Sequence, residues 1–150
     1  MRSIPSLIQN LEFKIQNSNG GMKVNIKEGL FYTDEHEWIS VEGNRGRVGI
    51  SDYAQHHLGD IVYVELPELD AGVAMSEAIG VIESVKAVAS LFSPAGGTIL
   101  EVNEELETSP ELLNEDCYAN WIALLELADS SELEKLMDAQ AYAAFCATLD

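Results

Sequence analysis

The sequence predicts a mainly β domain, a sandwich or barrel of short strands with short helices between them and one helix near the C-terminus. A chain of 150 residues, 47% of them apolar, is long enough for one domain with a packed core. Short runs rich in Val, Ile and Tyr follow one another closely between residues 30 and 126, separated by turn residues. An apolar stripe at helical spacing comes after them.

Residues 1–21 differ from the rest and end in NSNGG, which has the composition of a flexible linker. The segment lacks the apolar run of a secretory signal, and its single arginine and Glu12 are unlike a mitochondrial transit peptide. Met22 fits a natural start. We therefore expect a disordered extension over residues 1–21 and a single domain over residues 22–150. A bacterial cytoplasm is favoured over a mitochondrial matrix.

The strand series begins with EWISVEG and GRVGIS, which are bounded by glycine and asparagine. DIVYVEL follows and ends at Pro67. The later runs are AIGVIESV, AVASLFS, GTILEVN and WIALLEL. Gly, Ile and Val recur in the same register in the runs that begin at Gly59 and Gly97, a weak indication of two similar halves.

Two short helices are predicted between the strands. Ser51 fits the N-cap of a helix over DYAQHHL, which Gly59 would end. Ser109 fits the cap of the second, with Pro110 at its first position.

The C-terminal segment predicts the clearest helix, over about residues 131–147. Ser131 and Glu134 fit a capping box. One face of this helix is apolar and is expected to pack against the sheet. Its members are Leu133, Leu136, Met137, Ala141, Ala144 and Phe145.

The net charge of −18 restricts the partners. A surface this acidic repels nucleic acid and anionic lipid, so neither is expected to bind. No apolar run approaches the roughly 20 residues of a membrane span. Proteins with basic patches, or cations, are the expected partners. Solubility alone, or adaptation to a salty habitat, explains the charge equally well.

Lys86 is the only lysine or arginine between Arg47 and Lys135, an interval with eighteen acidic residues. It lies in IESVKAVAS, where β-forming residues on both sides predict a tight turn at Val85–Lys86. A type I turn is favoured over type I′, because valine is strained at positive φ. A lysine at such a tip exposes its amine on a flexible stem, where a modifying enzyme can acylate it. The alternative is an ordinary solvated lysine.

The sequence predicts no metal site and no catalytic residue. His56 and His57 are adjacent and diverge on a helix, and Cys117 and Cys146 form no CxxC pair. A small thiol hydrolase, in which Cys117 acts with a histidine, is kept as an alternative from a different functional class.

Four stretches resemble the glycine cleavage system H protein family of lipoyl carriers: YTDEHEW, VGISDYAQHHLGDIVYVELPE, IESVKAVASLFSPAGGTILEVNEEL and SPELLNED. The resemblance spans about residues 30–121, and the C-terminal helix is also similar. It implies a lipoyl-type barrel-sandwich hybrid with a lipoyl-binding core over about residues 45–127. It also implies that Lys86, in the ESVKA motif, carries lipoic acid in amide linkage as N6-lipoyllysine.

The resemblance implies a carrier and not an enzyme. Such a carrier accepts the aminomethyl group of glycine from glycine decarboxylase (P protein) and presents it to the aminomethyltransferase (T protein). Dihydrolipoamide dehydrogenase (L protein) then reoxidises the arm. A lipoyl donor that relays the cofactor to other proteins is the alternative in the same fold. A biotin carrier is less favoured, because Val85 and Ala87, not methionines, flank the lysine.

Residues around the lysine are expected to be recognised by the lipoyl-attaching enzyme. Glu83 is the nearest acidic candidate, and Ser84, Val85 and Ala87 belong to the same recognition segment. We hypothesise that the acidic surface docks on basic patches of the partners; a Michaelis constant that does not change with salt would contradict this. His36 is expected to line a cleft that shelters the loaded arm, with an ordinary surface histidine as the alternative.

The chain departs from the family in the run from Asp116 to Trp121. The family has a proline and then Tyr-Gly-x-Gly-Trp, whereas this run lacks both glycines and is one residue shorter. A different backbone path is expected there, because glycine reaches conformations that Ala and Asn reach less easily. Cys117, in this loop, is expected to be more exposed than a core cysteine.

Overall fold

The computed structural model describes residues 12–16 and 23–149. The strands are β1 (Glu12–Gln16), β2 (Lys23–Lys27), β3 (Phe31–Tyr32), β4 (Glu37–Glu42), β5 (Arg45–Ile50), β6 (Ile61–Glu65), β7 (Gly72–Val73), β8 (Ala78–Ser84), β9 (Val88–Phe92), β10 (Gly97–Val102) and β11 (Ala123–Leu127). The helices are α2 (Asp52–Leu58), α3 (Glu105–Thr108), α4 (Leu112–Glu115), the 3-10 helix η1 (Ser130–Lys135) and α5 (Ala139–Ala147). The predicted mainly β fold with short helices and a C-terminal helix is confirmed.

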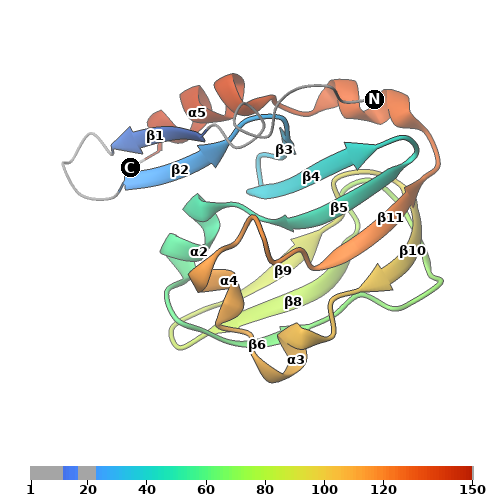
Figure 1. Ribbon diagram of the computed structural model, residues 1–150, viewed down its shortest axis with the longest axis horizontal. Coiled ribbons are helices and arrows are strands. Elements are labelled where there is room, and N and C mark those ends of the chain that lie inside the picture. The colour runs from blue at the N-terminus through green and yellow to red at the C-terminus, as the bar shows by residue number, and fades with distance from the viewer. Residues whose placement is uncertain (1–11, 17–22, 150) are drawn as a thin grey trace.

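The strands form two principal sheets and one small one (Figure 1). The six-stranded sheet, which we call the larger sheet, has the order β3-β4-β5-β11-β10-β7. The three-stranded sheet, which we call the smaller sheet, has the order β6-β8-β9, and β1 pairs with β2 in the third. Neighbouring strands are antiparallel in both sheets. The smaller sheet carries the β8–β9 turn, so the candidate lysine lies at the end of this layer.

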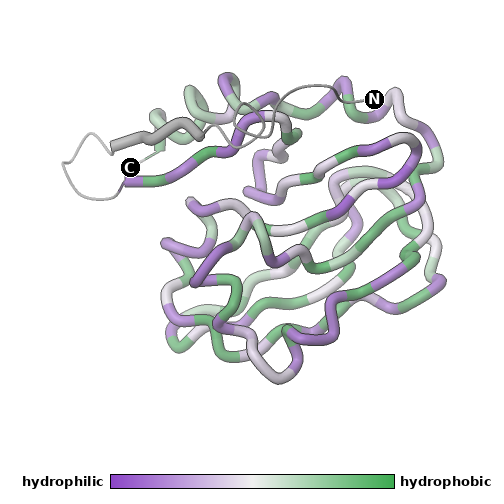
Figure 2. The backbone as a smooth tube through the Cα atoms, viewed as in Figure 1, coloured by the Kyte–Doolittle hydropathy of each residue, from purple (hydrophilic) through white to green (hydrophobic). Residues whose placement is uncertain are grey.

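The core lies between the sheets because alternate residues of each strand point inward. Figure 2 shows hydrophobic and hydrophilic residues alternating along many of the strands. Ile61 and Val64 of β6 are buried together with Ile82 of β8 and Leu91 of β9, and Ile50 of the larger sheet joins the same cluster. This packing fixes the smaller sheet, and therefore its turn, on the rest of the domain.

Within the extension expected over residues 1–21, the structure describes one segment, Glu12–Gln16. These residues form β1, which pairs antiparallel with β2, so that Glu12 lies opposite Lys27 and Gln16 opposite Lys23. Figure 1 shows α5 running along β1 and β2. Residues 1–11 and 17–21 lie outside the described residues.

The short helices follow the sequence signals in part. Ser51 caps α2, since its Oγ accepts the N–H of Ala54 at 3.2 Å, and Gly59 ends α2 with φ 79°. The helix expected after Ser109 begins later, because Glu111 is the N-cap of α4. None of the helices in the described part of the chain is long and apolar enough to cross a membrane.

The single helix expected over residues 131–147 is two helices, and its predicted capping box is wrong. Asp129 caps η1 by accepting the N–H of Ser131 at 3.0 Å, and Asp138 caps α5 by accepting the N–H of Ala141 at 2.8 Å. Between them Met137 exchanges two backbone hydrogen bonds with Tyr32, at 2.8 and 2.9 Å. This pairing requires extended backbone, which interrupts the helix.

Candidate functional site

Lys86 lies in the turn of the β8–β9 hairpin, which we call the lysine hairpin (residues 78–92). Glu83 lies opposite Val88 at the end of the ladder, and the N–H of Ser84 donates to the carbonyl of Ala87 at 2.8 Å. Val85 and Lys86 are therefore the central residues of the turn, as the sequence predicted. Neither has a positive φ, so the turn is not type I′.

The side chain of Ser84 holds this turn closed. Its Oγ accepts the N–H of Lys86 at 3.2 Å and the N–H of Ala87 at 3.0 Å. A serine hydroxyl at the first position of a turn can replace the asparagine or glycine that tight hairpins otherwise use. We expected only a recognition role for Ser84, although its position at the start of the turn was a usable signal for this structural role.

A second set of hydrogen bonds supports the hairpin from below. The N–H of Val85 donates to the carbonyl of Asp60 at 2.9 Å, which ties the turn to the segment after α2. A Cβ built on Gly59 would lie 3.6 Å from Cε of Lys86, so the lysine stem runs over this glycine. Asn114 of α4 fixes that segment, because its Oδ1 accepts the N–H of Ile61 and its Nδ2 donates to the carbonyl of Gly59, both at 2.9 Å.

The tip of the hairpin faces solvent. Val85, Lys86 and Ala87 are exposed, whereas Glu83 and Ser84 are half-buried. The structure thus places the five residues of the expected modification site on a turn whose backbone is held and whose lysine is accessible. Asn114 was missed, since nothing in a single sequence shows that this asparagine lies beneath the turn.

His36 lies apart from the hairpin tip, in an aromatic cluster between α2 and α5. Its ring stacks on Tyr53 with centroids 4.5 Å apart, and its Nδ1 lies 2.7 Å from the hydroxyl of Tyr142. Burial, together with the nearby His57, lowers the pKa of His36 to about 4. These contacts give His36 a packing role. Its expected role in sheltering the arm stays a prediction.

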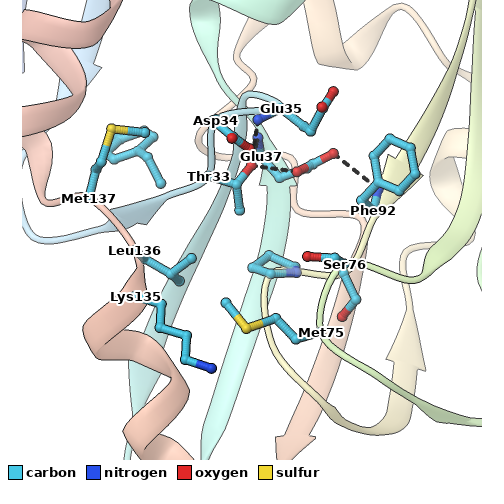
Figure 3. A pocket seen from close by; sticks show the side chains of 13 residues that line it. Thr33, Asp34, Glu35, Glu37, Met75, Ser76, Phe92, Lys135, Leu136 and Met137 are labelled. Atoms are coloured by element: carbon cyan, nitrogen blue, oxygen red, sulfur yellow. Dashed lines mark hydrogen bonds between the residues drawn. The ribbon is translucent and has the colours of Figure 1, made fainter.

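A cavity of about 410 Å³ is lined in part by the residues on either side of His36 in sequence, Glu35 and Glu37 (Figure 3). His36 is not among its lining residues. Glu37, at the start of β4, lies in its wall: one carboxyl oxygen accepts the hydroxyl of Thr33 at 2.6 Å and the other accepts the N–H of Phe92 at 3.0 Å. The buried carboxyl has lost water, and this desolvation raises the pKa of Glu37 to about 7.

Comparison with known proteins decides the family. The family model for the glycine cleavage H-protein matches residues 30–149. The chain belongs to the glycine cleavage H-protein family. H proteins are the lipoyl-carrier component of the glycine cleavage system and are not themselves catalysts.

Individual relatives agree with this assignment. The glycine cleavage system H protein of Alkaliphilus oremlandii is 56% identical over 118 residues, which cover 79% of this chain and 93% of that protein. The Clostridium botulinum H protein is 50% identical over 125 residues, covering 83% of this chain and 96% of the relative. The crystal structure of an H protein from Mycobacterium marinum matches with a TM-score of 0.74 at 35% identity, over 81% of this chain and 98% of that one. The lipoyl-type fold is therefore confirmed.

The loop in which this H-protein chain lacks the expected glycines is held by side chains. Asp116 Oδ1 accepts the N–H groups of Tyr118 and Ala119 at 3.2 and 3.1 Å, and Asn120 Nδ2 donates to the carbonyl of Asp116 at 2.9 Å. Such Asx hydrogen bonds stabilise a turn without glycine. The expected exposure of Cys117 is wrong, because the residue is buried and its carbonyl accepts the indole N–H of Trp38 at 3.2 Å.

The described residues of this H-protein chain contain no group of three or more His, Cys, Asp or Glu side chains that could hold a metal ion. Cys117 and Cys146 are both buried.

Glu37 makes the stability of this family member depend on pH. The folded state keeps a proton on Glu37 up to about pH 7, whereas the unfolded chain loses it near 4.5, so stability is lost as the pH rises between these values. We expect the free energy of unfolding of Glu37→Gln, relative to the original protein, to increase by about 2 kcal/mol between about pH 5 and pH 8. Urea unfolding at several pH values measures this.

His36 is present in both proteins, so its opposite pH effect cancels in the comparison. The depressed pKa of His36 gives stability that is lost as the pH falls from 6.5 towards 4. The glutamine amide oxygen can still accept the N–H of Phe92. If the two proteins instead gave parallel stability curves across this pH range, Glu37 would lose its proton at the same pH in the folded and unfolded states, which would contradict the prediction.

Proposed function

We propose that Lys86 is the lipoylation site and that the lipoyl arm carries the aminomethyl group of glycine from the P protein to the T protein, with reoxidation by the L protein. The observation that carries this proposal is an accessible lysine at the tip of a hairpin whose backbone is anchored to Asp60. The membership of this chain in the glycine cleavage H-protein family supports the P, T and L proteins as its partners. When bound, the lipoyl group supplies a disulfide that can be reduced, loaded and reoxidised.

The residues of the chain fit an attached arm. Ser84 and Asp60 hold the turn, so the attachment point has a defined position while the arm beyond it stays free to move. Attachment at one point raises the concentration of the arm at any docked partner. Acylation also removes the charge of Lys86, which leaves the interval between Arg47 and Lys135 without a lysine or arginine charge.

The proposed partners are the P, T and L proteins and the lipoyl-attaching enzyme, with Glu83 beside the lysine as a recognition residue. The relatives named above are bacterial, which supports a bacterial cytoplasm over a mitochondrial matrix as the proposed location. A lipoyl relay to other proteins would use the same lysine. The burial of Cys117 gives no support to a thiol hydrolase.

Peptide mass spectrometry of the natural protein tests the proposal. We expect the peptide that contains Lys86 to carry the mass increment of one lipoyl group, and peptides with the other lysines to carry none. The apo protein, made in cells without lipoate, provides the control. A natural protein whose Lys86 is bare in cells that make lipoate would contradict the proposed function.

A further inference from the structure

Exposed apolar side chains gather around the lysine hairpin. The described residues include five large hydrophobic residues that are exposed. Val85 and Val88 of the hairpin are each 70% exposed, and Val62 and Tyr63 of the adjacent strand are 53% and 49% exposed. Leu69, the fifth, is 49% exposed and lies past the other end of β6. Four of the five thus lie at one site, although single exposed hydrophobic residues usually scatter.

The strand register places two of these residues in one row. Tyr63 pairs with Glu83 in β8, and Glu83 pairs with Val88 in β9. Directly paired residues project from the same face of a sheet. The next row includes Val64 and Ile82, which are buried in the core. The row Tyr63–Glu83–Val88 therefore lies on the outer face of the smaller sheet, directly below the lysine turn.

An irregularity in β6 enlarges this surface. The ladder between β6 and β8 shifts register between Ile61 and Tyr63, so Val62 is an extra residue on β6. Such a bulge changes the direction of nearby side chains, and here two successive residues, Val62 and Tyr63, are both exposed. We call Val62, Tyr63, Val85 and Val88 the hairpin patch.

We propose that the hairpin patch, with Glu83 at its centre, is the docking surface for the enzyme that acylates Lys86; this inference rests on the proposed function. The partner is an acyltransferase or ligase with an apolar contact surface and a basic side chain that faces Glu83. This partner is identified by how closely each enzyme must approach the lysine. The acylating enzyme must bring its active site to the lysine amine itself, whereas the P, T and L proteins act on the far end of a long arm.

The reaction requires close contact at the turn. The ammonium of Lys86 first loses a proton, and its nitrogen then forms a bond to the carbonyl carbon of an activated acyl donor, such as an acyl adenylate. The bond from this carbon to the leaving group breaks, and the leaving group departs with the electron pair. A second proton leaves the nitrogen as the amide forms. The amine reaches only the length of its own side chain beyond the backbone, so the enzyme surface must cover residues beside the turn.

Substitutions in the patch test this proposal. Val88→Ser, Tyr63→Ser and the double variant are compared with Leu69→Ser, a control with the same exposed fraction as Tyr63. The probe is a purified bacterial lipoate ligase with lipoate and ATP, and mass spectrometry measures the rate at which Lys86 is lipoylated. We expect the KM for the carrier to rise about tenfold in each single variant and roughly a hundredfold in the double variant, with kcat unchanged, and Leu69→Ser to stay within about twofold.

A second measurement separates this partner from others. Each variant is lipoylated to completion with excess ligase, and its reduction by dihydrolipoamide dehydrogenase is then expected to match the original protein. An equal loss with both enzymes would overturn the assignment of the patch to the acylating enzyme. Sedimentation that shows a dimer of the original protein, lost in the double variant, would reassign the patch to a second copy of the chain.

The two proposals fail in different ways. If the original protein is not lipoylated at Lys86 by the ligase, the proposed function is overturned. If the original protein is lipoylated and the patch variants react at the same rate, only the docking proposal is overturned. Melting curves of the variants are expected to match that of Leu69→Ser, because all of the substituted side chains are exposed.

Discussion

Replacing Lys86 by arginine is expected to abolish acylation and to reduce glycine cleavage to the level seen without the carrier. Amide formation requires a nitrogen that loses its proton and attacks a carbonyl carbon. A guanidinium stays protonated at any pH the protein experiences and is a poor nucleophile. Intact mass before and after treatment with a lipoyl-attaching enzyme, followed by a coupled glycine cleavage assay, measures both effects.

The same substitution should leave the fold unchanged. Arginine keeps a long apolar stem that can run over Gly59 as the lysine stem does, and Lys86 is exposed. The backbone N–H that Ser84 accepts is retained. We expect the free energy of unfolding to change by less than about 0.5 kcal/mol.

Lys23→Arg, at an exposed lysine of β2, is the matched control and should acquire the lipoyl group at the normal rate. Glycine cleavage that persists with Lys86→Arg would place the carrier site elsewhere.

The architecture could be predicted from local signals because strands and caps leave a pattern in a few consecutive residues. Ser51 and Gly59 marked the ends of α2 correctly. The C-terminal helix was predicted too long, because the pairing of Met137 with Tyr32 joins residues that are far apart in sequence. For the same reason β1 was missed: its pairing with β2 depends on tertiary structure and not on its own composition.

At the site, too, local features could be predicted from the sequence and tertiary contacts could not. The turn at Val85–Lys86 was predictable, since β-forming residues flank a lone lysine. The support beneath it was not, because Asn114 reaches the segment at Gly59 from a separate helix. Glu37 shows the same limit: burial raises its pKa, and the residues that surround its carboxyl group, such as Phe92, are far from it in sequence.

Replacing Gly97 by alanine is expected to destabilise the domain by about 3 kcal/mol, through overpacking against backbone. Gly97 lies in β10 between two neighbouring strands and pairs with Leu127 on one side and Val73 on the other. A Cβ on Gly97 would overlap the carbonyl oxygen of Glu126 and lie 2.9 Å from its carbonyl carbon. Backbone atoms of a paired strand cannot rotate away as a side chain does, so β11 must move and strain the ladder. Urea unfolding measures the loss.

Gly72→Ala is the matched control for this prediction, because Gly72 lies in the adjacent strand β7 and pairs with Thr98 of β10. A Cβ on Gly72 would meet no heavy atom within 4 Å, so alanine should be tolerated there and can stabilise by about 0.5 kcal/mol by restricting the unfolded chain. Gly97→Ala should also lower the yield of lipoylated protein in cells, since the core beneath the lysine hairpin includes Ile50 of the larger sheet and Ile122, which directly precedes β11. Equal urea midpoints for the two variants would mean that β11 can shift without loss, and that the larger sheet does not determine the stability of the layer that carries Lys86.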